Sequence, residues 1–204
     1  MFFFHFSTPI LAVKTQKNTE YFFIIEILCN IDDYCVLTFY FCSWKFLKLT
    51  GIDLNLQFPA DWEQARRIKF EQGFTSPAPR DFVGEGPLVA PESLAVYNFT
   101  LAHNFRLIIA FHTQGRVIYW KFLDFNPPKA ALIAEEFSNI SGYALEETPY
   151  ASSFAGYKDW FIQNYNLPGY TIEVGLGDNP LPISQFPTIY AENVGVMTLG
   201  MVLA

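Results

Sequence analysis

Two polar residues, His112 and Glu173, end apolar segments that have the composition of buried strands. Residues 105–112 read Phe-Arg-Leu-Ile-Ile-Ala-Phe-His, a nearly continuous apolar run typical of a parallel strand covered on both faces. Residues 170–174 read Tyr-Thr-Ile-Glu-Val and set a carboxylate between apolar neighbours. A histidine and a glutamate at strand ends are what a metal-dependent hydrolase needs: an imidazole to hold zinc and a carboxylate to take a proton from metal-bound water.

Each residue also has a plainer interpretation. Glu173 could lie on the wet face of an edge strand, where a carboxylate costs nothing, whereas burial without a partner would cost several kcal/mol. His112 could be a histidine whose hydrogen bonds are satisfied in the core or in a loop. Because ligands bind beyond the carboxyl ends of strands in open α/β sheets, we expect the two side chains to face one cleft.

The elements around these residues alternate as they do in α/β proteins. Helices are predicted at 60–72, 91–102, 129–140, 157–164 and from 184 or 186 to 199, and further strands at 21–28 and 34–41. Asp61 is expected to cap the first helix, and Pro91 suits the first position of the second. In that second helix, Leu94, Ala95, Asn98, Leu101 and Ala102 are expected to form the apolar face. The sequence predicts a mixed, mostly parallel sheet with helices on both faces.

The composition changes near residue 50. Residues 1–50 hold nine of the 22 phenylalanines and no glycine, whereas all 12 glycines and 12 of the 13 prolines follow. Residues 1–50 are therefore predicted to be an atypical aromatic-rich segment, either a native subdomain or a stretch that does not belong to the domain. Residues 51–204 form the regular α/β part.

Charge and composition exclude several classes of protein. A net charge of -7 makes nucleic acid an unlikely partner. No run of eighteen residues is free of charge, so no transmembrane segment is expected. The apolar start lacks a basic region and a clear cleavage site, so it is not interpreted as a signal peptide. The three cysteines, Cys29, Cys35 and Cys42, match no zinc or redox spacing.

Four separated stretches resemble the zinc carboxypeptidase family, and they occur in the family's order. They are Gly-Ile-Asp-Leu-Asn at 51–55, the loop from Gly84 to Pro91-Glu92, the strand ending Ala-Phe-His-Thr-Gln-Gly, and Gly-Tyr-Lys-Asp-Trp at 156–160 followed by the strand with Glu173. The segments Phe-Pro-Ala-Asp-Trp-Glu and Pro-Tyr-Ala-Ser-Ser-Phe-Ala-Gly-Tyr are most similar to the bacterial γ-D-glutamyl-L-diamino acid endopeptidases, which cut peptidoglycan stem peptides.

This resemblance implies roles for four residues. His112 would be a zinc ligand and Glu173 the general base, with zinc as cofactor. Asn55 would contact the substrate, and Tyr150 is the nearest match to a tyrosine that closes over substrate. The implied partner is a peptidoglycan stem peptide, and the implied setting is the cell wall, a spore or the exterior of a bacterium.

Two departures from the family pattern matter. Leu56 follows Asn55 where the family has an arginine, which argues against clamping a C-terminal carboxylate and favours the endopeptidase branch. The family's His-x-x-Glu motif, which supplies two zinc ligands, is absent from residues 1–50. The chain has only three histidines, His5, His103 and His112. We therefore expect an incomplete carboxypeptidase-like domain with impaired hydrolysis, or a noncatalytic peptide-binding pseudoenzyme.

Overall fold

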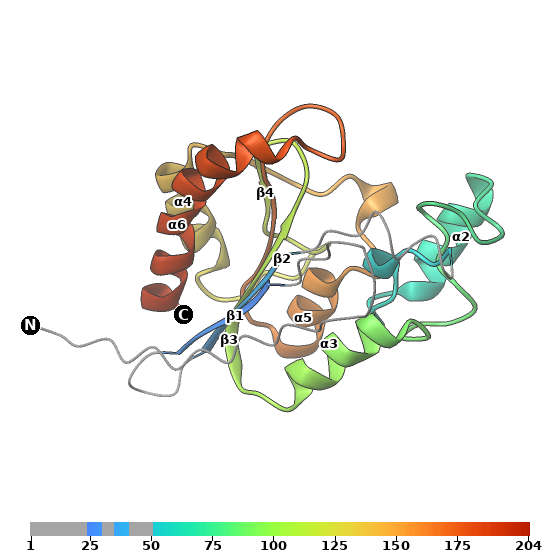
Figure 1. Cartoon of the computed structure of the whole chain (residues 1–204). Coiled ribbons are helices and arrows are strands. Elements are labelled where there is room, and N and C mark those ends of the chain that lie inside the picture. Colours follow the sequence, from blue (N-terminus) through green and yellow to red (C-terminus); the bar gives the residue numbers. More distant parts are fainter. Residues whose placement is uncertain (1–23, 30–34, 41–50) are drawn as a thin grey trace, which may run out of the picture.

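The computed structural model describes residues 51–204 and, for their backbone alone, residues 24–29 and 35–40. Its described part contains a six-stranded sheet in the order β1-β2-β3-β6-β4-β5 (Figure 1). The strands are β1 Ile24–Cys29, β2 Cys35–Tyr40, β3 Phe105–His112, β4 Val117–Tyr119, β5 Ala144–Glu146 and β6 Gly169–Glu173. Strand pairs β2–β3, β3–β6 and β4–β5 are parallel, and β1–β2 and β4–β6 are antiparallel. The predicted mixed, mostly parallel sheet is confirmed.

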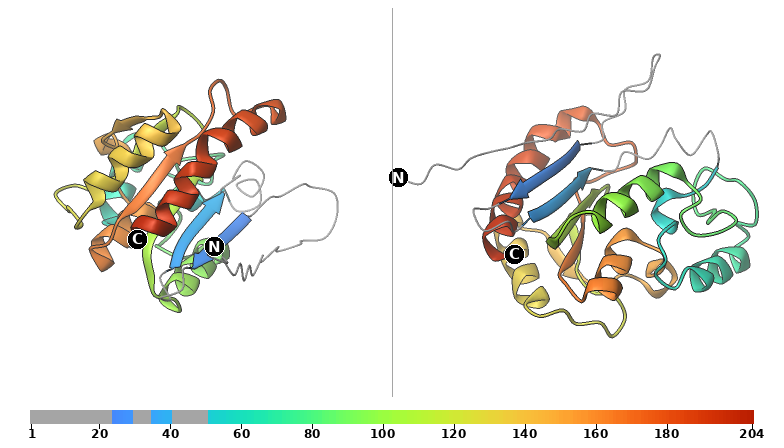
Figure 2. Two further views of the ribbon diagram at one scale, coloured as in Figure 1. Left: turned by 90° about the vertical axis from the view of Figure 1, so that its left-hand side faces the viewer. Right: turned by 90° about the horizontal axis from the view of Figure 1, so that it is seen from below.

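Helices cover both faces of this sheet. They are α2 Trp62–Glu71, α3 Pro91–Leu101, α4 Ala130–Ser141, α5 Tyr157–Tyr165 and α6 Phe186–Leu203, with short 3-10 turns η1 Leu54–Leu56, η2 Tyr150–Ser152 and η3 Ile183–Gln185. Helices α4 and α6 lie on one side of the sheet, and α3 and α5 lie on the other, with α2 beyond them (Figures 1 and 2). None of the helices in the described residues combines the length and apolarity needed to cross a bilayer.

Strand β3 separates two hydrophobic cores because successive side chains point to opposite faces. Leu107, Ile109 and Phe111 pack into the core beneath α4 and α6, whereas Ile108 and Ala110 pack into the core beneath α3 and α5. Strand β6 follows the same rule, with Tyr170 and Ile172 in the α4–α6 core. His112, Thr171 and Glu173 therefore belong to the face that α3 and α5 only partly cover.

Most predicted elements from residue 60 onward are confirmed to within four residues at their ends. Of the two strands predicted before residue 50, β2 lies within 34–41, and β1 overlaps 21–28 but ends one residue later, at Cys29. Strands β4 and β5 were not predicted. Pro91 occupies the first turn of α3 as expected. Asp61 does precede α2, but it makes no side-chain capping bond, because its backbone is left-handed with φ 49°. That prediction was wrong.

The predicted apolar face of α3 was also wrong. Leu94 and Leu101 are exposed, and the buried face consists of Ser93, Val96 and Thr100. The two hydroxyl groups can be buried because both are hydrogen-bonded. Ser93 Oγ donates to the Leu54 carbonyl at 3.2 Å, and Thr100 Oγ1 donates to the Val96 carbonyl at 2.9 Å.

Candidate active site

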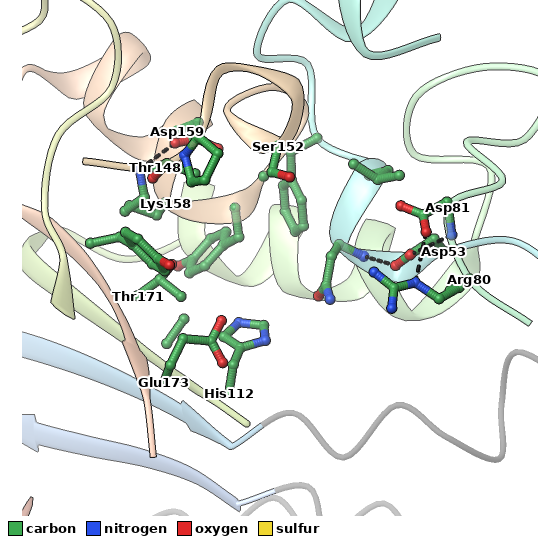
Figure 3. Close-up of a pocket in the computed structure, with 18 of the residues that line it drawn as sticks. Asp53, Arg80, Asp81, His112, Thr148, Ser152, Lys158, Asp159, Thr171 and Glu173 are labelled. Atoms are coloured by element: carbon green, nitrogen blue, oxygen red, sulfur yellow. Dashed lines mark hydrogen bonds and ion pairs between the residues drawn. The ribbon is translucent and has the colours of Figure 1, made fainter. Parts of the chain in front are cut away.

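A pocket of about 350 Å³ opens at the carboxyl ends of β3 and β6, on the face that carries α3 and α5 (Figure 3). Its floor comes from the sheet, and each of its two walls combines loop residues with residues of a helix, α2 in one wall and α5 in the other. The sheet supplies Ala110, His112, Tyr119, Thr171 and Glu173. One wall contains Asp53, Asn55, Lys69, Arg80 and Asp81, and the other contains Thr148, Pro149, Ser152, Lys158 and Asp159.

His112 and Glu173 lie side by side on this floor. They are paired in register across the parallel strands β3 and β6, and the Val174 N–H donates to the His112 carbonyl at 2.8 Å. Neighbouring strands are about 4.8 Å apart, so both side chains enter the pocket together (Figure 3). The structure thus brings the two into one cleft, as expected for side chains at the carboxyl ends of neighbouring parallel strands. Their chemical roles stay predictions.

The Glu173 carboxyl group is largely buried. Burial raises its pKa from 4.5 to about 7. Its Oε2 atom is buried and has no hydrogen-bond partner in the part of the chain that the structure describes. A carboxyl group in this state can hold or release a proton near neutral pH, which is what a general acid or base requires.

His112 is the last residue of β3. Burial lowers its pKa from 6.5 to about 4, so the imidazole is neutral at neutral pH. Neutral imidazole is the form that binds a metal ion. The surroundings of His112 therefore keep it in the protonation state of a ligand.

Replacing Glu173 should stabilise the fold at neutral pH. The pKa of Glu173 in the folded state lies above the ordinary value of 4.5, so ionisation of this carboxyl group destabilises the fold. This destabilisation is absent below about pH 4.5, grows between about pH 4.5 and pH 7, and stays constant above pH 7. In metal-free buffer, Glu173→Gln should raise the free energy of unfolding by up to roughly 3 kcal/mol at pH 8 and leave it unchanged at pH 4. Urea unfolding at both pH values measures this. The exposed Glu136→Gln is the control, and an equal effect at both pH values would contradict the account.

The first wall is organised around Asp53, which precedes η1. Its Oδ1 accepts the Asn55 N–H at 3.1 Å and its Oδ2 accepts the Asp81 N–H at 2.9 Å. These bonds fix Asn55 at the pocket and tie η1 to the loop that carries Asp81. Burial raises the pKa of Asp53, although both backbone N–H groups oppose this. Leu56 also lines the pocket, but its side chain is buried in the core and brings no charge.

The opposite wall is held by Lys158 and Asp159 in the first turn of α5. Lys158 Nζ donates to the Lys121 carbonyl at 2.8 Å and pairs with Asp159 Oδ1. Gly156 is required here, because a Cβ atom at that position would lie within 2.3 Å of Asp159 Oδ2. The Gly-Tyr-Lys-Asp-Trp sequence thus builds a buried ion pair into the pocket wall.

Tyr150 does not enter the pocket. Its ring is 63% exposed and packs edge-on against Phe154, with 5.1 Å between ring centroids. Its hydroxyl accepts a long hydrogen bond of 3.5 Å from Gln64 Nε2 in α2. Its neighbours Pro149 and Ser152 do line the pocket, so Tyr150 lies at the margin. A contact between Tyr150 and substrate stays a prediction.

The described residues do not complete a zinc site. Within residues 51–204, no three His, Cys, Asp or Glu side chains gather closely enough to hold one ion. Catalytic zinc takes three protein ligands, and His112 offers one. We therefore assign no catalytic step to the metal.

Sequence reasoning missed the charged residues of the first wall. Lys69, Arg80 and Asp81 come from a helix and a loop that carry no strand-end signal, and only the tertiary structure brings them to the pocket. The segment Gly-Tyr-Lys-Asp-Trp resembles the family, but the resemblance implies no role for Lys158.

Comparison with known proteins agrees with this fold and pocket. Residues 13–195 match the zinc carboxypeptidase family model, and the chain belongs to that family of zinc-dependent peptidases. It is 49% identical over 163 residues to γ-D-glutamyl-L-diamino acid endopeptidase 1 of Lysinibacillus sphaericus, a match that covers 80% of this chain and 39% of that protein.

Solved structures share the fold. Thrombin-activatable fibrinolysis inhibitor superposes with a TM-score of 0.56 at 19% identity, over 74% of this chain and 41% of that one. Murein-tripeptide amidase MpaA from Escherichia coli O157 superposes with a TM-score of 0.50 at 17% identity, over 75% of this chain and 59% of that one. The chain spans about two-fifths of the length of the curated relatives it matches.

Proposed function

We propose that the pocket binds γ-D-glutamyl-diamino acid peptides of peptidoglycan, with Glu173 as the general base and His112 as a zinc ligand. The observation that carries this proposal is the pairing of His112 with Glu173 on the floor of one pocket. The similarity to an endopeptidase named for that bond supports the substrate class. Asn55, fixed at the pocket by Asp53, and Tyr150, at its margin, are the proposed substrate contacts.

Hydrolysis by this chain is proposed to be impaired. Residues 1–50 contain no His-x-x-Glu motif, and the described residues supply one of the three ligands that catalytic zinc needs. The same observations favour a second candidate, a noncatalytic protein that binds the peptide without cutting it. The two candidates share the pocket and differ only in turnover.

Calorimetric titration with a γ-D-glutamyl-diaminopimelate peptide tests the substrate class. The γ-linked peptide should bind, and its α-linked isomer of identical composition should bind at least several-fold more weakly. Thr171→Tyr, which fills the pocket, should abolish binding, whereas Thr198→Tyr, at an exposed position of α6, should not. Equal affinity for both isomers, or binding that survives Thr171→Tyr, would refute the proposal.

The division of the chain at residue 50 is also a proposal, because the composition changes there while the family match runs from residue 13 to 195. Limited proteolysis should cut within residues 1–50 before it cuts residues 51–204, and mass spectrometry of the fragments locates the cuts. Uniform protection of both parts would show instead that residues 1–50 are a true subdomain.

A further inference from the structure

Three basic side chains line the pocket, Lys69, Arg80 and Lys158. Lys158 is 4% exposed and has its own carboxylate in Asp159. Lys69 is 8% exposed and pairs with Asp81 Oδ1 at 2.6 Å. Arg80 shares that same carboxylate, because its Nε donates to Asp81 Oδ2 at 2.7 Å. The Asp81 carboxylate thus pairs with two cations. Of these two side chains, Lys69 is buried and Arg80 is 79% exposed.

Arg80 is held in place although it is exposed. Asp81 is fixed by the buried Lys69 on one oxygen and by its own N–H bond to Asp53. Asp81 therefore anchors the guanidinium through Nε and leaves the two terminal nitrogens, Nη1 and Nη2, without a hydrogen bond to the described residues. That edge has the fork geometry that binds a carboxylate with two parallel hydrogen bonds. In Figure 3 the guanidinium points inward from the Asp53–Asp81 wall, toward the side of the pocket with His112 and Glu173.

Asp81 is the one carboxylate hydrogen-bonded to Arg80 among the described residues, and it shares its charge with Lys69. Arg80 is also attracted to Asp53, but both Asp53 carboxylate oxygens accept backbone N–H groups and neither is hydrogen-bonded to Arg80. Asn55 and Leu56, which line the same part of the pocket, are uncharged. The first wall therefore offers a pre-oriented guanidinium edge to a ligand in the pocket.

We infer that Arg80 is a specificity-determining residue that binds the free α-carboxylate of the D-glutamyl residue in the substrate. This inference rests on the proposed function. In a γ-D-glutamyl bond the side-chain carboxyl group forms the amide, which leaves the α-carboxylate ionised and close to the scissile bond. An α-linked peptide, or one whose α-carboxylate is amidated, lacks a carboxylate at that place. Arg80 thus selects the ionised γ-linked form.

The test compares two peptides that differ at one group. One is L-alanyl-γ-D-glutamyl-diaminopimelate, and the other has the glutamyl α-carboxylate converted to the amide. Calorimetry on the full chain should show roughly 10- to 100-fold weaker binding of the amide, the range expected for a hydrogen-bonded charge pair. Arg80→Gln should bind both peptides equally, at the affinity of the amide. Arg80→Lys, which keeps the charge and loses the fork, should restore part of the discrimination.

Arg67→Gln, an exposed cation on α2 outside the pocket, is the matched control and should discriminate as the unaltered protein does. If the unaltered protein binds both peptides equally, or if Arg80→Gln still discriminates, the inference is overturned and the proposed function stands. If neither peptide binds the unaltered protein, the proposed function fails and the inference fails with it. Thermal unfolding of each variant checks that the fold is retained.

Discussion

Purified protein should retain far less than one zinc ion per chain after it is loaded with zinc and desalted. A catalytic zinc site is tight because a fold holds three ligands together, whereas His112 provides a single neutral imidazole. For the same reason, added zinc should leave the unfolding midpoint unchanged, since only a ligand that binds the folded state tightly stabilises it. Elemental analysis and thermal unfolding measure the two effects.

Two histidine variants test whether His112 contributes to a tight zinc site. His112→Ala and the control His103→Ala, whose histidine is exposed in the loop after α3, should both leave the low zinc content as it was. A stoichiometric zinc ion that disappears in His112→Ala but not in His103→Ala would show that two further ligands exist in the chain.

Asp81→Asn should cost about 3–5 kcal/mol of folding free energy, because it leaves the buried Lys69 ammonium group without a carboxylate. Asparagine keeps the size of the side chain and tolerates the left-handed backbone at this position, where φ is 68°. The lost folding free energy therefore measures the loss of the charge pair and not backbone strain. Urea unfolding at pH 7 measures it.

The double variant Lys69→Met with Asp81→Asn is the matched control. It removes both charges and should recover most of the loss, since replacing a whole buried pair is far less costly than breaking it. If the double variant is no more stable than Asp81→Asn alone, Asp81 acts through its other contacts and the pair does not carry the effect.

The Lys69–Asp81 ion pair also makes the free energy of unfolding depend on pH in the acid range. Burial by itself would raise the pKa of Asp81, but Lys69 and Arg80 outweigh it and hold the pKa below 3.8. A carboxylate with a lowered folded-state pKa stabilises the fold fully above its ordinary pKa and loses that contribution as the pH falls through the folded value. The difference between the unaltered protein and Asp81→Asn should therefore shrink below about pH 3.8.

The fold could be predicted largely because its central elements carry strong local patterns. Apart from the exposed Arg106 and the terminal His112, residues 105–112 are apolar on both faces of the strand, and that pattern has few other interpretations. Strands β4 and β5, with three residues each, are too short to show any period. The buried face of α3 was missed because it uses hydroxyl groups that find partners only in the folded chain: Thr100 Oγ1 lies 2.9 Å from the Tyr157 hydroxyl, 57 residues away in sequence.

The residues of the pocket also fall into those that local sequence patterns predict and those that they do not. His112 and Glu173 could be located because each ends a strand, where the fold itself creates a cleft. Lys69, Arg80 and Asp81 could not, because a lysine in a helix and an Arg-Asp pair in a loop look like ordinary surface charges until the structure packs them together. The charge pattern of the pocket is a tertiary property, and the local sequence does not contain it.

The most direct test of the account is a turnover measurement on the full chain. The protein is incubated with zinc and the γ-D-glutamyl-diaminopimelate peptide, and the products are separated and identified by mass spectrometry. The peptide should bind, and its cleavage should stay at or close to the level of a control without protein. Efficient cleavage of the γ-D-glutamyl bond that is lost in Glu173→Gln, in His112→Ala and on addition of a chelator would contradict the proposed impairment and show a complete zinc peptidase.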